Sequence, residues 1–291
     1  MKVCIVGVGL LGGSFALGLK EKVKDLELTG VEINEINAKK SLELGLVHDI
    51  LPFENAVSQA DLTVLATPVD VMLWQLKLAL DTIKDDGIVI DMGSTKKILC
   101  KSVENHPKRS RYVAGHPIAG TENSGPEAAF ADLLKKKIMI LCEKEKSDPE
   151  AFEKVSSLCE MLEMNISHMN ASEHDLHMAY VSHLSHISSF ALGSIVLEKE
   201  KDERNIFNMA GSGFSSTVRL AKSSPQMWAP IFTQNTSNIS AALGDYILKL
   251  QEFKKIIDEK DEDSSRDLMH RANDIRRILS GIDIRTEASK K

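Results

Sequence analysis

The chain has 291 residues, more than a single hydrophobic core ordinarily supports, so two domains are expected. Its formal net charge of −6 argues against general affinity for nucleic acids, which depends on concentrated positive charge, and an anionic ligand would need local cationic groups. The composition, 43% hydrophobic and 27% charged, is that of a soluble globular protein. A membrane anchor is not expected, because no segment approaches the roughly 20 apolar residues of a membrane span.

The cysteines are far apart in the sequence and form no CxxC pair. This spacing predicts neither a zinc site nor a disulfide framework. Buried thiols in the reducing cytoplasm are the expected state of all four, which are Cys4, Cys100, Cys142 and Cys159.

Short apolar runs alternate with helical stretches in the first part of the chain, a pattern typical of a parallel β-sheet covered by helices. After about residue 170, the apolar residues follow a 3.6-residue period and strand-like runs stop. We therefore expect an α/β domain over residues 1–170 and an all-helical domain over residues 171–291. The predicted strands are residues 2–6, 26–31, 62–67, 87–92, 112–115 and 137–142.

The first predicted strand runs directly into GVGLLG, a GxGxxG motif that opens a helical pattern. The three glycines permit a tight turn, close approach of the backbone to a pyrophosphate, and close packing of the helix on the strand. The start of the helix then offers unpaired N–H groups to the phosphates. In this context the motif predicts a Rossmann-type domain. The residues expected at the dinucleotide are Gly7, Gly9, Leu10, Leu11 and Gly12.

Glu32 lies 20 residues after Gly12, at the end of the second predicted strand. Its carboxylate can accept hydrogen bonds from the ribose hydroxyls and would repel a 2′-phosphate, and no Arg or Lys occurs between Glu32 and Ala38. The expected cofactor is therefore NAD rather than NADP. Thr67 and Pro68 follow a later strand and are candidates to border the cofactor, although turn residues after a strand need no function.

Two further strands lead into polar segments at the carboxyl edge of the predicted sheet, where ligands of open α/β sheets bind. DMGSTK places Ser94 and Lys96 at this edge, and GHPIAGTENSG places His116 there on a glycine-containing loop. Oxidation of an alcohol by hydride transfer needs a proton acceptor, so His116 is predicted to be the general base.

Two long helices are predicted in the second half, over residues 171–199 and 225–257. Their apolar stripes are broad enough to pack on each other or on a second subunit, so a helical dimer is expected. His183 lies on the stripe of the first helix, and His186 shares its face because the two are three positions apart. No metal site is predicted on that face, which carries no acidic partner. The charged segment 254–267 is predicted to be a solvated connection before a last helix.

Five motifs in this order together resemble the prephenate dehydrogenase family of tyrosine biosynthesis: GVGLLGGS, DMGSTK, GHPIAGTENSG, SHLSH, and GSGF followed by VRLAKSSPQMW. The resemblance extends from residue 1 to about residue 250, and HPIAGTE is its distinctive motif. It implies an architecture similar to that of 6-phosphogluconate-dehydrogenase-like enzymes. That architecture is a Rossmann-type nucleotide-binding domain followed by an all-helical dimerisation domain, in a homodimer.

The resemblance also implies the reaction, which is NAD-dependent oxidative decarboxylation of prephenate to 4-hydroxyphenylpyruvate and carbon dioxide. His116 would accept the proton of the substrate hydroxyl, and Ser94 would align the hydroxyl or the imidazole. Arg219 is the candidate for binding a substrate carboxylate, because its planar guanidinium can donate two hydrogen bonds. His183 and His186 look like the helix histidines of the family, of which His186 matches the one associated with the pyruvyl side chain.

Two further positions of the motifs matter for the substrate side. Glu122 resembles a family position that gates or orders the active site through an ionic contact, and a solvated loop carboxylate is the alternative interpretation. Trp228 is expected to pack in the core of the helical part. The chain departs from many relatives at Ser215 and Ser216, where they have a basic and an acidic residue, and this puts some polar contacts to the substrate in doubt.

Four alternatives remain at this point. Arogenate dehydrogenase and a dual-specificity cyclohexadienyl dehydrogenase share the motifs, and only His186 favours prephenate. Dehydrogenases of the phosphogluconate or hydroxyisobutyrate type rely on a lysine in the helical domain, but residues 171–198 of the first predicted helix contain none. A non-catalytic NAD-binding sensor would have no reason to keep Ser94, His116 and Arg219 together.

Overall fold

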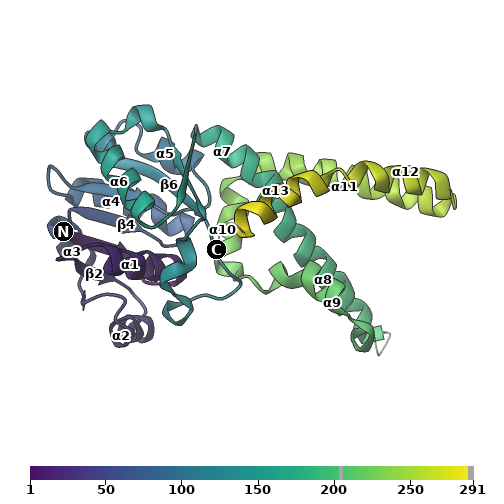
Figure 1. The fold of residues 1–291 in the computed structure, drawn as a ribbon, viewed down its shortest axis with the longest axis horizontal. Helices are drawn as coiled ribbons and strands as arrows, with labels where there is room; N and C mark the ends of the chain where they lie inside the picture. The colour runs from purple at the N-terminus through teal and green to yellow at the C-terminus, as the bar shows by residue number, and fades with distance from the viewer. Residues whose placement is uncertain (203–205, 288–291) are drawn as a thin grey trace. The chain divides into compact units, whose positions relative to one another are not determined.

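The computed structural model describes residues 1–202 and 206–287, which fall into two compact units, Met1–Thr236 and Ser237–Lys291. The first unit contains an eight-stranded sheet with helices on both faces (Figure 1). Its strand order is β3-β2-β1-β4-β5-β6-β7-β8, and the first six positions follow the order of a Rossmann fold, which confirms the predicted fold class. The strands are β1 (Lys2–Val6), β2 (Glu27–Val31), β3 (Asp49–Ile50), β4 (Leu62–Leu65), β5 (Ile88–Asp91), β6 (Tyr112–Ile118), β7 (Ile138–Cys142) and β8 (Asn165–Met169).

The sheet is mixed, whereas the alternating pattern predicted a parallel one. Strands β1 to β6 run parallel to their neighbours, but β7 is antiparallel to β6, and β8 is parallel to β7. The connection from β6 to β7 contains only short 3₁₀ turns, at Pro126–Ala128 and Ala131–Leu134, so it lacks the helical crossover that returns a chain to a parallel strand. Strands β3 and β8 were not predicted, because β3 has only two residues and β8 is half exposed and partly polar.

Two apolar cores lie on opposite faces of the sheet. Alternate residues of β1 show the division, since Ile5 belongs to one core while Cys4 and Val6 belong to the other. Helices α1 and α6 contribute to the first core, and α3, α4 and α5 contribute to the second. The helices of this part are α1 (Leu10–Lys22), α2 (Glu35–Glu43), α3 (Phe53–Gln59), α4 (Val69–Thr82), α5 (Lys97–Ser102) and α6 (Pro149–Met161).

The helical part of the first unit begins with a capping box, in which the Asn170 side chain and the Glu173 side chain each pair with the backbone of the other residue. The single helix predicted over residues 171–199 is interrupted by a π-helical turn, Ala179–His183, which widens one turn of the backbone. Helix α8 packs against α9 and against the 3₁₀ turn Arg219–Lys222. The helices are α7 (Ala171–Met178), α8 (Leu184–Asp202), α9 (Ser212–Val218) and α10 (Pro225–Gln234).

The chain continues into α11 (Thr236–Asp258), α12 (Glu262–Ala272) and α13 (Ile275–Glu287). The single helix predicted over 225–257 is therefore wrong, because α10 ends before Asn235 and α11 starts after it. The predicted connection over 254–267 is also wrong. Helix α11 runs to Asp258, and the Asp261 side chain starts α12 by accepting a hydrogen bond from the Ser264 amide.

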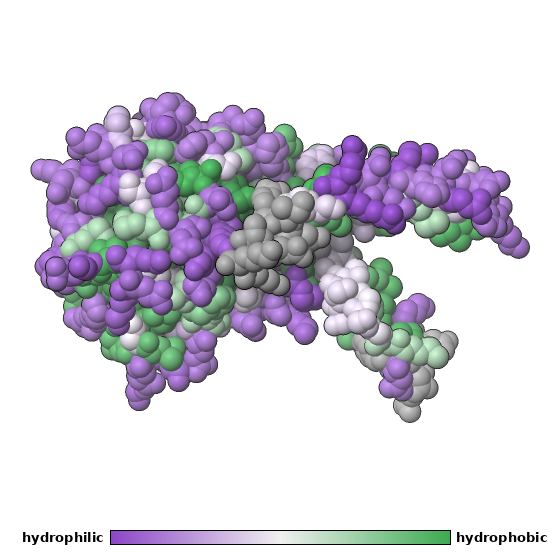
Figure 2. Space-filling view, in the orientation of Figure 1, coloured by the Kyte–Doolittle hydropathy of each residue, from purple (hydrophilic) through white to green (hydrophobic). Residues whose placement is uncertain are grey.

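The charged character of this segment does correspond to exposure. Lys254 pairs with Asp258, and Arg266 pairs with Glu262 at 2.6 Å, both on the helix surface. Figure 2 shows hydrophilic residues over most of the visible surface of α11 and α12. None of the helices in residues 1–202 and 206–287 is long and apolar enough to cross a bilayer.

Candidate active site

The glycine motif forms the turn between β1 and α1. Gly7 has φ +89°, and a Cβ there would lie 2.9 Å from the Ala66 carbonyl oxygen, so the turn itself requires glycine. A Cβ at Gly12 would lie 2.2 Å from the Gly7 carbonyl oxygen. Gly9 differs, because nothing lies within 4 Å of the position of its missing Cβ. The space beside Gly9 therefore fits the pyrophosphate of a dinucleotide.

The start of α1 is suited to an anion. Its N-cap residue, Gly9, has no side chain to pair with the first amides, and no acidic residue lies in the first turn. Leu10 and Leu11 occupy this turn, where backbone N–H groups lack helical acceptors. The positive end of the helix dipole adds to the attraction for phosphate.

The other predicted cofactor residues lie at the same carboxyl edge of the sheet. Glu32 directly follows β2, and its Oε1 accepts a hydrogen bond from the Asn34 amide at 3.0 Å. Thr67 follows β4 and lies beside the glycine turn, since a Cβ at Gly7 would be 2.9 Å from the Thr67 methyl group. Pro68 is the N-cap residue of α4. These positions surround the loop that the nucleotide would contact.

The sequence predicted His116 on a glycine-containing loop, and this was wrong. The residue lies inside β6. The strand continues to Ile118 because residues 114–118 pair with β7. Gly115 is required for close strand contact, since a Cβ there would lie 2.7 Å from the Asp91 carbonyl oxygen of β5. The glycines with positive φ, Gly120 and Gly125, come only after the strand. The histidine is thus fixed in the sheet and 9% exposed.

A hydrogen-bonded chain extends from His116 into α7. Its Nδ1 lies 2.8 Å from Nε2 of His174, and Nδ1 of His174 lies 2.8 Å from Oδ1 of Asp175. The Asp175 carboxylate also accepts the backbone N–H of Lys96 at 2.7 Å and that of Lys97 at 3.0 Å. Within the described residues, Nε2 of His116 makes no hydrogen bond. Sequence reasoning missed both His174 and Asp175.

The surroundings keep these imidazoles neutral. Burial, followed by the nearby His174 and Lys96, lowers the pKa of His116 well below its ordinary value. Burial also lowers the pKa of His174, against the opposing effect of Asp175. A neutral imidazole with an unpaired ring nitrogen can accept a proton from a reacting hydroxyl.

A fully buried ion pair lies next to β6, since its carboxylate accepts hydrogen bonds from two residues of that strand. Asp91, the last residue of β5, pairs with the ammonium group of Lys96, and neither side chain has any exposed surface. Asp91 also accepts hydrogen bonds from the Tyr112 hydroxyl at 2.6 Å, the Gly93 amide at 2.8 Å and the Gly115 amide at 3.1 Å. The expectation that Lys96 emerges at the ligand edge is wrong, because its ammonium group is buried and paired with the Asp91 carboxylate.

The remaining residues of the DMGSTK segment have different surroundings. Ser94 is half-buried, and no hydrogen bond joins it to His116 in the part of the chain that the structure describes. Thr95 donates to Oε1 of Gln234 at 2.6 Å, and Nε2 of Gln234 donates to the Val69 carbonyl oxygen at 2.8 Å. Gln234, which the sequence did not indicate, therefore connects the loop after β5 to the start of α4.

The two helix histidines lie beside Trp228. His183 is buried in the π-helical turn, and its Nδ1 accepts a hydrogen bond from the Asn235 amide nitrogen at 3.2 Å. The rings of His186 and Trp228 stack with centroids 3.5 Å apart, and Nδ1 of His186 donates to the Ser182 carbonyl oxygen at 3.1 Å. Nε2 of His183 and Nε1 of Trp228 are buried and have no hydrogen-bond partner among the described residues. Burial lowers the pKa of His183 to about 4.

Arg219 contacts the segment that follows His116. Its Nη1 lies 3.3 Å from Oε2 of Glu122, and the arginine side chain is 52% exposed. A hydrogen bond from its own backbone amide, and then the charge of Arg219, lower the pKa of Glu122. Ser215 and Ser216 are exposed on α9, one turn before Arg219. Among the described residues, this guanidinium pairs with Glu122, and more than half of the arginine side chain faces solvent.

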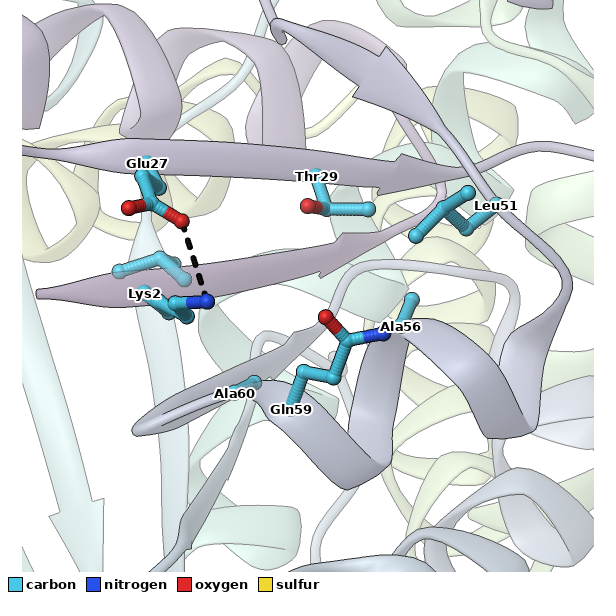
Figure 3. Close-up of a pocket in the computed structure, with 8 residues that line it drawn as sticks. Lys2, Glu27, Thr29, Leu51, Ala56, Gln59 and Ala60 are labelled. Carbon is cyan, nitrogen blue, oxygen red and sulfur yellow. Dashed lines mark ion pairs between the residues drawn. The ribbon is translucent and has the colours of Figure 1, made fainter.

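His116 does not line either of two hollows in the described residues. A cavity of about 30 Å³ is lined by Lys2 and Glu27, the first residues of β1 and β2, and so lies toward the edge opposite the glycine turn (Figure 3). A cleft of about 660 Å³ lies between α2 and residues 124–127, where Lys40 pairs with Glu127 at 3.1 Å. In residues 1–202 and 206–287, no cluster of three or more His, Cys, Asp or Glu side chains could hold a metal ion.

Two family models match the chain over most of its length. The model described as "Prephenate dehydrogenase, nucleotide-binding domain" matches residues 15–168. The model described as "Prephenate dehydrogenase, dimerization domain" matches residues 170–271. The two matches follow the order of the α/β part and the helical part.

Individual relatives give the same result. The chain is 30% identical to the prephenate dehydrogenase of Bacillus subtilis (strain 168) over 265 residues, which are 90% of this chain and 71% of that protein. It is 29% identical over 263 residues to the cyclohexadienyl dehydrogenase of Zymomonas mobilis, covering 90% of each. The crystal structure of prephenate dehydrogenase from A. aeolicus in complex with hydroxyphenyl propionate and NAD+ matches with a TM-score of 0.86 and 31% identity, over 97% of this chain and 98% of that one.

Proposed function

We propose that this chain, which belongs to the prephenate dehydrogenase family, oxidises prephenate with NAD and releases carbon dioxide and 4-hydroxyphenylpyruvate. The observation that carries the proposal is the place of His116, a buried histidine at the carboxyl edge of a nucleotide-binding sheet, whose Nδ1 pairs with His174 and whose Nε2 has no hydrogen-bond partner among the described residues. Burial lowers its pKa, which favours the neutral form that a base needs. Arogenate, or both compounds, is the second candidate substrate, because the relative from Zymomonas mobilis is named a cyclohexadienyl dehydrogenase.

NAD is supported as the cofactor by three observations. The open space beside Gly9 fits a pyrophosphate, and the uncapped start of α1 offers amides to it. Glu32 lies where a carboxylate would bind ribose hydroxyls and repel a 2′-phosphate. The related protein from A. aeolicus was crystallised with NAD+. When bound, NAD supplies the hydride acceptor for the reaction.

His116 would act as the general base. As the hydride leaves the carbinol carbon of the substrate ring, the hydroxyl proton moves to Nε2 of His116 and a carbonyl forms. The bond to the quaternary carboxylate then breaks, its electron pair enters the ring, and carbon dioxide leaves as the ring becomes aromatic. The residues therefore need mainly to position the substrate and remove one proton. Ser94 is proposed to align the hydroxyl.

Substrate binding would use cationic and N–H groups from the helical part. Prephenate carries two carboxylates, and Arg219 can bind one of them in place of its exposed contact with Glu122. The ring nitrogens Nε2 of His183 and Nε1 of Trp228 are buried and have no partner in residues 1–202 and 206–287, so each is a donor that needs an acceptor oxygen. His186, stacked on Trp228, is proposed to recognise the pyruvyl group.

A homodimer is the proposed assembly. The second family model is described as a dimerization domain, and it matches residues 170–271. Helix α11 exposes three large apolar side chains, and their burial against a second subunit would be favourable. They are Ile247, Leu248 and Leu250. Sedimentation at micromolar protein concentration tests this assembly, and a monomeric mass would contradict it.

One assay separates the candidate functions. Purified protein is mixed with NAD and prephenate, then with NAD and arogenate, and NADH absorbance is followed; NADP replaces NAD as the cofactor control. Turnover with prephenate alone supports the first proposal, and turnover with arogenate alone or with both assigns the second. Binding of NAD without turnover of either compound would instead indicate a sensor.

A further inference from the structure

We propose that His174 and Asp175 are positioning residues that fix the tautomer of His116, leaving its Nε2 bare to act as the base, and that His174 then takes the proton onward. This inference rests on the proposed function for the role of His116. Its structural basis is the hydrogen-bonded chain that joins the three side chains, in which both hydrogen bonds are 2.8 Å long.

The direction of the chain is set at Asp175. Its carboxylate oxygens each accept a backbone N–H, from Lys96 at 2.7 Å and from Lys97 at 3.0 Å. A carboxylate has no hydrogen to give, so its contact with the His174 ring must be an N–H donated from the ring. Nδ1 of His174 therefore carries a hydrogen. Because burial keeps this imidazole neutral, its Nε2 carries none.

The same reasoning passes to the next ring. A bare Nε2 on His174 can only accept, so Nδ1 of His116, 2.8 Å away, must donate. Nε2 of His116 is then the ring nitrogen with the free lone pair. The reverse assignment would set the bare Nδ1 of His174 against the Asp175 carboxylate at 2.8 Å, with lone pairs facing each other and no hydrogen between them.

The chain also provides a path for the proton. When Nε2 of His116 accepts the substrate proton, the ring becomes an imidazolium, and its Nδ1 hydrogen can cross the hydrogen bond to Nε2 of His174. The bond from Nδ1 of His116 to hydrogen breaks as the bond from hydrogen to Nε2 of His174 forms. The positive charge then rests next to the Asp175 carboxylate, and His116 is neutral again.

The fold holds the far end of the chain firmly. His174 is fully buried and Asp175 is 1% exposed, both in a helix that starts with a capping box. The Asn235 side chain donates to the Asp175 carbonyl oxygen at 2.7 Å. With both its side chain and its backbone engaged, Asp175 has little freedom to turn away from His174.

The test combines kinetics with a direct measurement of the tautomer. In protein labelled with ¹⁵N histidine, long-range proton–nitrogen spectra are expected to show His116 with hydrogen on Nδ1 and a bare Nε2. Asp175→Ala removes the acceptor that holds hydrogen on Nδ1 of His174, so His174 can carry its hydrogen on Nε2 and donate it to Nδ1 of His116, and hydrogen is expected to move to Nε2 of His116. The substitution should lower kcat by roughly 10³- to 10⁴-fold with KM changed by less than about threefold, as expected for a wrong tautomer.

A second variant covers the case in which Asp175→Ala does not fold. His174→Gln keeps an acceptor oxygen for His116 but cannot take a proton. It is expected to retain the Nδ1 hydrogen of His116 and to lose about 10- to 100-fold in kcat, the range for groups that orient a functional imidazole. His177→Gln, an exposed substitution on the same helix, is the matched control and should match the wild-type rate.

The outcomes separate this inference from the proposed function. Hydrogen on Nε2 of His116 in the wild-type protein, or a wild-type kcat in both variants, would overturn the inference even if prephenate is turned over. If neither prephenate nor arogenate is turned over but the spectra show the expected tautomer and its reversal in Asp175→Ala, the proposed function fails and the positioning role stands.

Discussion

The buried pair of Asp91 and Lys96 predicts an unequal response to removal of either partner. Asp91→Asn leaves an ammonium group in the core without a counter-charge. It also places an amide NH₂ against two donors whichever way the amide turns, because one carboxylate oxygen faces Lys96 and Gly93 while the other faces Tyr112 and Gly115. The expected loss in the free energy of unfolding is about 3–5 kcal/mol.

Lys96→Met is expected to cost less. The methionine fills a similar volume without charge, and the Asp91 carboxylate keeps three of its four hydrogen bonds, from Tyr112, Gly93 and Gly115. Loss of one charge-assisted hydrogen bond corresponds to about 1.5–3 kcal/mol. Urea unfolding followed by far-UV circular dichroism, at one protomer concentration, measures both variants. Lys97→Met, at an exposed side chain, is the control and should stay within about 0.5 kcal/mol of wild type.

The refuting result is a reversed order. If Lys96→Met destabilises the protein as much as Asp91→Asn or more, then the lysine charge is what the site depends on, and the donor geometry around Asp91 does not explain the pair.

Three other outcomes are expected. His116→Asn should lower kcat by about 10²- to 10⁴-fold while NAD binding, measured by calorimetry, is unchanged; a near-normal rate would remove His116 from the mechanism. Arg219→Ala should raise KM for the substrate roughly 10- to 150-fold, from the loss of a charge-assisted pair of about 1.5–3 kcal/mol, and an unchanged KM would mean that the carboxylate is bound elsewhere. His183 has a folded pKa of about 4 against 6.5 when unfolded, so the unfolded state binds a proton first as pH falls. Protonation of His183 should therefore lower the free energy of unfolding by up to about 3 kcal/mol as pH falls from 6.5 to 4. Above pH 7, this residue should have no effect on the pH dependence of that free energy. Urea unfolding at several pH values should show a shallower slope in His183→Gln, and an equal slope would contradict the assignment.

Local sequence patterns predicted the elements whose cause is local. The glycine motif fixed the turn after β1, and strands buried on both faces, such as β4, appear as continuous apolar runs. The direction of β7 could not be read in this way, because an apolar run has the same composition whichever way it pairs. The end of β6 was missed for a related reason, since Gly115 and Pro117 are typical of turns and only the pairing with β7 keeps them extended.

The candidate site was predictable only in part. His116 stands in a distinctive motif, but its partner His174 is 58 residues away, and nothing in the segment around His174 predicts a contact with β6. The capping box of Asn170 and Glu173 indicates a helix start and no more. Lys96 does follow β5, but its side chain is buried, whereas the sequence predicted it at the ligand edge. Its burial depends on the ion pair with Asp91, an acidic residue at the end of an apolar strand.

The absence of a Cβ at Gly115 lets β5 and β6 lie close together just before His116. The carbonyl oxygen of Asp91 lies only 2.7 Å from the place where any other residue would carry its first side-chain carbon, closer than a real Cβ contact allows. Even alanine would push the two strands apart, and the imidazole is attached to the very next residue. Since misplacement by about 1 Å can slow a reaction roughly a hundredfold, Gly115, which has no reactive group, should tolerate as little substitution as His116, the proposed base beside it.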